Sequence, residues 1–189
     1  MCEFTAKDYK KGQPRWCPGC GDHFFLASLH KAMAEIGVAP WDIAVISGIG
    51  CSSRLPHYMN TYGMNTIHGR SAAIATGCKV ANPNLTVWQV SGDGDGLAVG
   101  SNHFIHASRR NINVNMILLN NRSYGLTKGQ YSPTSPRGFV SKSSPYGTVE
   151  DPFCPAELCF GARGNFFARA VATDAAGTID VLKAAYNHK

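Results

Sequence analysis

The sequence predicts an α/β fold: a mostly parallel open sheet with helices on both faces. Short runs of apolar residues alternate along the chain with segments in which apolar residues recur every three or four positions. Several of the apolar runs end at glycines, as buried strands do where they meet a loop. This alternation is typical of a parallel sheet covered by helices on both sides.

Strands are expected in four segments rich in apolar residues: 42–47, 85–90, 114–119 and 166–172. Helices are expected in segments with three-to-four spacing: 24–38, 71–80, 97–110 and a last helix after residue 174. Asp174 is predicted to cap that last helix with its side chain. Residues 120–155 contain five prolines and many Ser and Thr, so they are predicted to form a long ordered loop with functional potential.

Length and composition predict one globular domain. The chain has 189 residues, of which 44% are apolar and 16% charged, and it holds no run of the roughly 20 apolar residues that a membrane span needs. Residues 1–15 are predicted to form a polar arm without the features of a secretion signal, which favours the cytoplasm. Residues 16–189 are expected to form the binding domain. We expect it to be truncated at its C-terminus, because a further strand would normally follow the last helix.

Charge and cysteine content narrow the function further. The net charge is +6, but the basic residues are scattered and form no stripe, so nucleic acid is not expected as a partner. An anionic cofactor or an acidic protein partner explains the same balance. Seven cysteines in a chain without a secretion signal indicate metal, cluster or buried-thiol roles and not a disulfide framework.

Two polar motifs follow neighbouring predicted strands. Gly-Asp-Gly-Asp at residues 92–95 follows one strand, and Asn120-Asn121 follows the next. The carboxyl ends of parallel strands share one edge of a sheet, so the Asp93 carboxylate and the Asn121 amide oxygen are expected within reach of one Mg²⁺ completed by phosphate. Glycines in the first motif let backbone amides approach that phosphate. Taken separately, the first motif is also compatible with a turn and the second with a helix cap.

Cysteines define two further motifs. Trp-Cys-Pro-Gly-Cys-Gly at residues 16–21 contains Cys17 and Cys20, and Gly-Ile-Gly-Cys-Ser-Ser at residues 48–53 places Cys51 after the first predicted strand. Thiolates that converge on one point bind zinc or an iron–sulfur cluster. By its spacing alone, Cys-x-x-Cys is equally compatible with a redox pair or half a zinc site. Cys51 favours a cluster only if the fold brings it near.

Together these motifs resemble a known family. Along the chain the motifs follow one another in this order: Trp-Cys-Pro-Gly-Cys-Gly, Gly-Ile-Gly-Cys-Ser, His68-Gly69-Arg70, Gly-Asp-Gly, Asn-Asn, and Tyr-Gly-Leu-Thr-Lys-Gly-Gln at residues 124–130. From about residue 15 to the end, this pattern resembles the β subunit of a 2-oxoacid:ferredoxin oxidoreductase. The resemblance implies a thiamine diphosphate-binding fold.

The resemblance also implies roles for individual residues. Asp93, Asn121 and the main-chain oxygen of Ser123 would hold Mg²⁺. Cys17, Cys20 and Cys51 would hold a 4Fe-4S cluster, with its fourth cysteine expected beyond Lys189. The residues expected to bind the cofactor are Gly50, Cys51, Ser52, His68, Gly92, Asp93, Gly94, Asp95, Asn121, Tyr124, Gly125, Leu126 and Thr127.

The implied reaction is oxidative decarboxylation of a 2-oxoacid with coenzyme A to acyl-CoA, CO₂ and reduced ferredoxin. The implied partners are ferredoxin and an α subunit, which would supply the glutamate that activates the cofactor. Arg54 and Lys128 are expected to contact substrate carboxylates, His68 the cofactor or the 2-oxo group, and Leu126 is expected to wall the pocket. 2-Oxoglutarate is favoured over pyruvate because Lys128 could receive a second carboxylate.

Two other functions fit parts of the sequence. A non-redox thiamine diphosphate-dependent decarboxylase or synthase would use the Gly-Asp-Gly and Asn-Asn pieces without needing the cysteines. A zinc-stabilised nucleic-acid-binding module would account only for Cys-x-x-Cys and the positive charge. Iron and sulfide content separates the first alternative from the oxidoreductase, whereas zinc and steeply salt-dependent binding would indicate the second.

Overall fold

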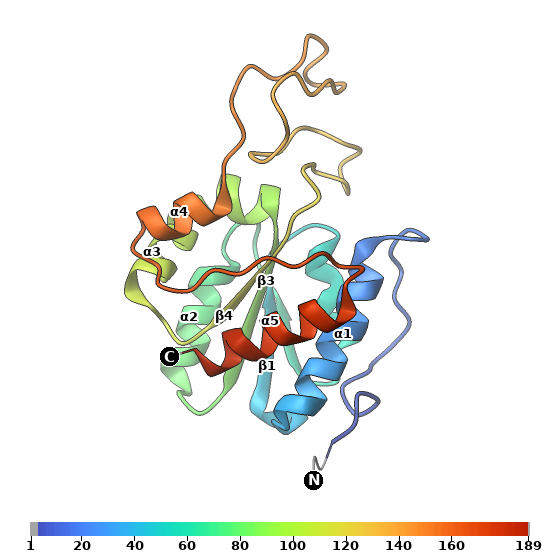
Figure 1. Ribbon diagram of the computed structural model, residues 1–189, viewed down its shortest axis with the longest axis vertical. Helices are drawn as coiled ribbons and strands as arrows, with labels where there is room; N and C mark the ends of the chain where they lie inside the picture. Colours follow the sequence, from blue (N-terminus) through green and yellow to red (C-terminus); the bar gives the residue numbers. More distant parts are fainter. Residues whose placement is uncertain (1–3, 189) are drawn as a thin grey trace.

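The computed structural model describes residues 4–188 and shows a parallel four-stranded sheet between two layers of helices (Figure 1). The strand order is β2-β1-β3-β4. The strands are β1 (Ile43–Ser47), β2 (Tyr62–Asn65), β3 (Thr86–Gly92) and β4 (Asn115–Leu119). The α-helices are α1 (Gly21–Ile36), α2 (Ser71–Ala81), α3 (Ser101–Arg110), α4 (Pro155–Gly161) and α5 (Ala175–Asn187). Short 3-10 helices cover Pro40–Asp42 and Ser52–Tyr58, and a π-helical turn, η3, covers Asp95–Val99.

Strand β1 shows why the sheet needs helices on both faces. All five of its residues are buried, and successive side chains of a strand point to opposite faces. Ile43 and Val45 belong to the core cluster that includes α1 and Leu182 of α5, whereas Ala44 and Ile46 pack with Ala75 of α2. The predicted class, an open parallel sheet covered on both faces, is confirmed.

The strand predictions were correct in three cases and wrong in one. Strands β1, β3 and β4 occupy the first three predicted segments within a few residues. Residues 166–172 form no strand, because they make no ladder hydrogen bonds to a neighbouring strand. Strand β2 was not predicted: its four residues are all exposed, and it lies at the edge of the sheet, so no apolar pattern marks it.

The α-helix predictions hold with two differences, and the predicted N-terminal arm differs as well. The helix expected over 97–110 is divided at Gly100 into η3 and α3. Helix α4 was not predicted, although it begins with a proline at its first position. The segment expected to be a polar arm packs on the domain from residue 4 onward, and Tyr9 is fully buried and donates its hydroxyl to the Val38 carbonyl.

The carboxyl ends of the strands carry the long loop. Residues 120–153 project beyond the sheet from the end of β4 and contain no helix or strand (Figure 1). Asp174 caps α5 as predicted, since its carboxylate accepts a hydrogen bond from the Gly177 N–H at 3.0 Å. Among residues 4–188 there is no helix with the length and apolar character needed to cross a membrane.

Candidate cofactor-binding site

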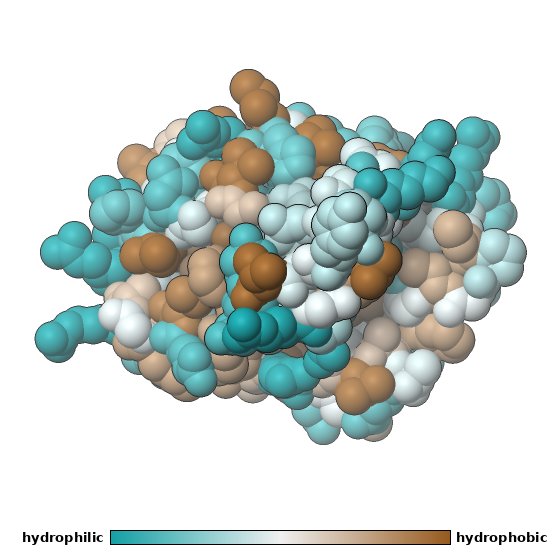
Figure 2. Space-filling model, turned by 90° about the horizontal axis from the view of Figure 1, so that it is seen from above, coloured by the Kyte–Doolittle hydropathy of each residue, from teal (hydrophilic) through white to brown (hydrophobic). Residues whose placement is uncertain are grey.

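A cavity of about 1080 Å³ opens at the carboxyl ends of the strands and continues along β4 toward residues 164–170. Most of the residues predicted from the sequence line it: Cys17, Cys20, Gly50, Cys51, Ser52, His68, Gly92, Asp93, Gly94, Asp95, Asn121, Ser123, Tyr124, Gly125, Leu126 and Thr127. Figure 2 shows the molecule from this end, with apolar side chains interspersed among polar ones. The topology explains the gathering, because β1, β3 and β4 are parallel neighbours.

Asp93 lines this cavity and is 1% exposed. Its carboxylate accepts hydrogen bonds from the hydroxyls of Ser132 and Thr134, the latter at 2.7 Å. The Asn121 N–H points to its other oxygen at 3.4 Å. The structure therefore brings Asp93 and Asn121 together, as the register of β3 with β4 requires.

These groups have the right chemistry for a hard cation. Carboxylate and amide oxygens are the ligands that Mg²⁺ takes in proteins, usually together with phosphate oxygens. Asn121 is an exposed residue, and its amide oxygen accepts a hydrogen bond from the Ser123 N–H at 3.1 Å. The donor set of Asp93, Asn121 and Ser123 therefore fits a magnesium ion that carries a diphosphate.

Tyr124 packs directly on the Gly-Asp-Gly turn. Its hydroxyl donates to the Gly94 carbonyl at 2.9 Å, and a Cβ at residue 94 would overlap its ring. Burial raises the pKa of Tyr124, and the negative charges of Asp93 and Asp95 raise it further, so the phenol remains a hydrogen-bond donor. Glycine at 94 is therefore required by this close approach of ring and backbone.

The three cysteines of the predicted cluster line another wall of the cavity. Their backbone segments are joined: the Trp16 indole donates to the Cys51 carbonyl at 2.7 Å, and the Arg15 N–H donates to the Tyr58 hydroxyl at 3.0 Å. Cys17 is exposed, whereas Cys20 and Cys51 are half-buried, and none forms a disulfide. The fold thus brings Cys51 to the same side of the molecule as the Cys-x-x-Cys motif.

The thiols themselves do not form a finished metal site. In the part of the chain that the structure describes, no three His, Cys, Asp or Glu side chains are grouped so that they could hold a metal ion. Burial raises the pKa of the Cys51 thiol, and the nearby negative charge of Asp22 raises it further. Burial likewise raises the pKa of Cys20. Soft thiols fit an iron–sulfur cluster or zinc by their chemistry, and binding either would require them to lose their protons.

The predicted substrate residues are divided by the structure. His68 and Leu126 line the cavity, and Leu126 is 56% exposed. Arg54 does not line it, because its guanidinium donates to the Arg15 carbonyl at 3.2 Å. Lys128 is exposed on the loop and has a left-handed backbone, with φ of 80°. That Arg54 or Lys128 contacts a substrate carboxylate stays a prediction.

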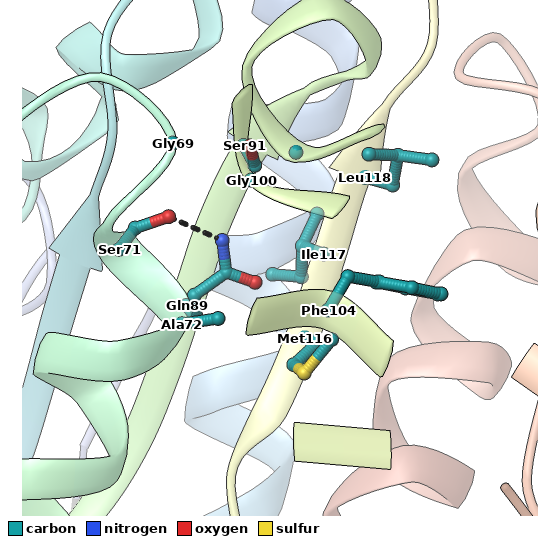
Figure 3. Close-up of a pocket in the computed structure, with 11 residues that line it drawn as sticks. Gly69, Ser71, Ala72, Gln89, Ser91, Gly100, Phe104, Met116, Ile117 and Leu118 are labelled. Atoms are coloured by element: carbon teal, nitrogen blue, oxygen red, sulfur yellow. Dashed lines mark hydrogen bonds between the residues drawn. The ribbon is translucent and has the colours of Figure 1, made fainter. Parts of the chain in front are cut away.

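A second, much smaller cavity of about 30 Å³ lies beneath the site, between β3, β4 and the helices α2 and α3 (Figure 3). Gln89 of β3 donates to the Ser71 hydroxyl at 2.7 Å across its edge. Apolar side chains of Phe104, Met116 and Ile117 make up much of the lining. It has room for about one water molecule and is too small for a cofactor.

Sequence reasoning missed the residues that hold the predicted ligands in place. Ser132 and Thr134 are buried and bind Asp93 from a loop about 40 positions away, and Asp22 lies beside the thiols of Cys20 and Cys51. The one signal for the first pair is the cluster of Ser and Thr between prolines at residues 132–136. Nothing in the local sequence indicates which carboxylate those hydroxyls meet.

Comparison with known proteins defines the class. Residues 48–189 match the family described as thiamine pyrophosphate enzyme, C-terminal TPP binding domain. The chain therefore belongs to the thiamine pyrophosphate enzymes, and its fold is the thiamine diphosphate-binding fold predicted from the sequence.

Its relatives specify the branch of that family. The chain is 53% identical over 185 residues to the 2-oxoglutarate oxidoreductase subunit KorB of Mycobacterium tuberculosis, covering 97% of this chain and 50% of the relative. It is 48% identical to subunit beta of 2-oxoacid:ferredoxin oxidoreductase 1 of Aeropyrum pernix, covering 92% and 55%. It is thus a relative of the β subunits of 2-oxoacid:ferredoxin oxidoreductases. The chain spans about half the length of these relatives.

A solved structure agrees with this placement. The 2-oxoglutarate:ferredoxin oxidoreductase of Magnetococcus marinus, with 2-oxoglutarate, coenzyme A and succinyl-CoA bound, superposes with a TM-score of 0.97 at 42% identity. The match covers 100% of this chain and 65% of that chain. At this identity the likeness extends beyond the fold to the family.

Proposed function

We propose that the chain is the β subunit of a 2-oxoacid:ferredoxin oxidoreductase that converts a 2-oxoacid and coenzyme A to acyl-CoA, CO₂ and reduced ferredoxin. The observation that carries this proposal is one cavity that holds buried Asp93 beside Asn121 and also carries Cys17, Cys20 and Cys51 on its wall. A non-redox thiamine enzyme would not need the three cysteines. 2-Oxoglutarate is the favoured substrate, since the relatives include subunits of 2-oxoglutarate enzymes.

Asp93, Asn121 and the Ser123 carbonyl would hold Mg²⁺ and, through it, the diphosphate of the cofactor. Thiamine diphosphate supplies a carbon nucleophile and an electron sink when it is bound. The protein's share is positioning. Ser132 and Thr134 hold Asp93 in place, and the Tyr124 ring fixes the Gly94 turn, so that the backbone beside Asp93 is ordered before a ligand arrives.

Cys17, Cys20 and Cys51 are the proposed cluster ligands. Support comes from the hydrogen bond between Trp16 and the Cys51 carbonyl, which fixes the two cysteine segments side by side. Cluster binding requires the thiols to lose their protons, and the fourth ligand stays a prediction.

The α subunit and ferredoxin are the proposed protein partners, and the cytoplasm the proposed location. Within the site, His68 is the proposed contact for the cofactor or the 2-oxo group and Leu126 the proposed apolar wall, since both residues line the cavity. Lys128 and Arg54 are the proposed contacts for substrate carboxylates. For Arg54 this role requires its guanidinium to leave the Arg15 carbonyl.

The decisive experiment is anaerobic reduction of a redox dye by the complex purified through a tag on this chain. 2-Oxoglutarate and pyruvate are tested in parallel, each with and without coenzyme A, and iron and sulfide are measured on the same sample. Coenzyme A-dependent dye reduction that is faster with 2-oxoglutarate is expected. Release of CO₂ without dye reduction, from a sample free of iron and sulfide, would support the non-redox decarboxylase instead. Zinc without thiamine diphosphate affinity would refute both.

A further inference from the structure

Asp95 is a buried carboxylate that the proposed chemistry leaves without a role. It is 3% exposed and lies at the start of η3. One oxygen accepts hydrogen bonds from the N–H groups of Ile49 at 3.1 Å and Gly69 at 2.7 Å, and the other accepts from the Ser91 hydroxyl at 2.6 Å. Both oxygens are therefore engaged within the chain, and Asp95 is not free to act as a cofactor or metal ligand.

His68 completes this arrangement. Its Nδ1 lies 2.8 Å from an Asp95 oxygen, is buried, and makes no aligned hydrogen bond among the described residues. The rest of the side chain is 37% exposed and lines the cavity. A carboxylate beside Nδ1 favours the ring form that carries its proton there, as in other carboxylate–histidine pairs. With Nδ1 turned inward, the opposite edge of the ring carries Nε2, and the exposed part of the side chain lines the cavity.

Packing around Asp95 leaves this arrangement little freedom. A Cβ at residue 48 would overlap the Asp95 carboxylate, so the turn after β1 closes directly on it. Gly69 has φ of 73°, and a Cβ there would lie 2.6 Å from backbone atoms of Val99 and Gly100. The two turns that meet Asp95 are thus held by close backbone contact as well as by hydrogen bonds. A site fixed in this way before binding loses little entropy when its ligand arrives.

We propose that Asp95 is a positioning residue that acts through His68: it holds the imidazole with Nδ1 inward and Nε2 toward the cavity. This inference rests on the proposed function, because it assigns His68 a contact in that reaction. Asp95 itself touches neither the cofactor nor the substrate. The hydrogen bonds that Asp95 accepts from the N–H groups of Ile49 and Gly69 bring the turn after β1 and the turn before α2 to the same point.

The variant Asp95→Asn separates the effect of Asp95 on His68 from its role in joining the two turns. Its amide oxygen can still accept from Ile49 and Gly69, and its NH₂ can donate to the Ser91 hydroxyl, so the turns stay closed while the negative charge beside His68 is lost. The matched control is Asp180→Asn, which makes the same chemical change at an exposed position on α5. Both are made in the complex, with His68→Gln and the double variant Asp95→Asn/His68→Gln.

If Asp95 acts through His68, Asp95→Asn lowers kcat at least roughly tenfold while affinity for thiamine diphosphate, measured by equilibrium dialysis, changes less than about threefold. His68→Gln shows a similar loss, and the double variant is no slower than His68→Gln. Losses that multiply in the double variant would overturn the inference. So would a wild-type rate in Asp95→Asn, or a defect confined to cofactor affinity and thermal stability.

A crystal structure of the complex carrying Asp95→Asn gives a test that does not depend on turnover. A neutral amide oxygen attracts the Nδ1 edge of His68 less than a carboxylate does. We therefore expect the His68 ring to rotate or lose order while the Ile49 and Gly69 turns stay in place. An unchanged His68 ring would overturn the inference even if the wild-type complex oxidised no 2-oxoacid. That second result, absence of 2-oxoacid oxidation by the wild type, would refute the proposed function and not the Asp95–His68 arrangement.

Discussion

The candidate site has an aspartate-bearing half, residues 92–95 with their partners, and a cysteine-bearing half, residues 15–20 and 51–58. In the first, the buried carboxylates are themselves fixed: Asp93 by two hydroxyls and Asp95 by two backbone N–H groups and Ser91. In the second, fixation stops at the backbone. Trp16 holds the Cys51 carbonyl, and Tyr58 holds Arg15, but among residues 4–188 the thiols are not grouped as ligands of a single metal ion.

The difference follows from how strongly the buried groups of each half would destabilise the folded chain when no ligand is bound. A buried carboxylate without hydrogen-bond donors is strongly destabilising, so Asp93 and Asp95 need protein partners in the folded chain. A thiol is a weak hydrogen-bonding group that tolerates burial in its neutral form, and burial keeps Cys20 and Cys51 neutral by raising the pKa of each. The aspartate-bearing half is therefore ordered in advance, whereas the cysteine-bearing half leaves its last step to the ligand.

Asp93→Ala gives the largest effect and tests whether the halves are independent. Loss of the central carboxylate is expected to weaken Mg²⁺-dependent thiamine diphosphate binding more than about 100-fold, since even indirect support of a metal ligand is worth 10-fold to 100-fold. Iron content should stay at the wild-type level, because the cysteine segments make no hydrogen bond to Asp93. Equilibrium dialysis and iron analysis measure the two, with Asp180→Asn as control. Parallel loss of iron would show that the halves are coupled.

Buried His30, which contacts the cysteine-bearing half at Tyr58, makes the stability of the fold sensitive to pH. It is 3% exposed, its ring lies 3.3 Å from the Tyr58 carbonyl, and burial lowers its pKa from 6.5 to about 4. Between these values the unfolded chain binds a proton that the folded chain does not. The free energy of unfolding should therefore fall as pH decreases from 6.5 to 4, by roughly 2 to 3 kcal/mol in total.

Urea unfolding at pH 7 and pH 4.5 measures this loss. His30→Leu, which cannot be protonated, should lack that share of the pH dependence while other groups titrate as before. An identical pH dependence in the two proteins would contradict the assignment.

Gly94→Ala tests how tightly the aspartate-bearing half is packed. A methyl group at residue 94 overlaps the Tyr124 ring, so the substitution should lower the free energy of unfolding by about 2 kcal/mol, as overpacking does. Chemical denaturation measures the loss. Combining it with Tyr124→Ala removes the ring that is overlapped, so the double variant should lose less than the sum of the single losses. Additive losses would show that the ring and residue 94 do not meet.

Much of the aspartate-bearing half could be predicted because strand topology alone places it. Strands β3 and β4 are recognisable apolar runs, and once they are parallel neighbours, Asp93 and Asn121 must adjoin. The hydroxyls on Asp93 could not be predicted, since they come from residues 132–134 of a loop without periodicity. Arg54 could not be placed either, because a charged side chain beside a motif can turn to any nearby carbonyl.

The same limit explains the errors in the fold. Residues 166–172 have strand-like composition, but a strand also needs a hydrogen-bonded neighbour, which local sequence cannot supply. Strand β2 has that neighbour in β1 and forms although its side chains are exposed. Whether such a short segment forms a strand depends on a neighbouring strand to pair with, and the whole fold determines whether that neighbour is present.

Trp16→Phe gives the smallest expected effect and tests the backbone fixation of the cysteine-bearing half. Phenylalanine keeps an aromatic ring beside Tyr58 and His23 but cannot donate to the Cys51 carbonyl. Loss of one such hydrogen bond should cost about 1 kcal/mol, which corresponds to roughly fivefold faster alkylation of the Cys51 thiol if labelling follows local opening. Mass spectrometry of iodoacetamide-treated protein follows Cys51 directly. Trp41→Phe is the matched control, since Trp41 is 62% exposed and lies outside the cavity. Equal labelling rates in both variants would mean that the indole N–H does not hold this segment, and that the cysteine-bearing half is fixed by packing alone.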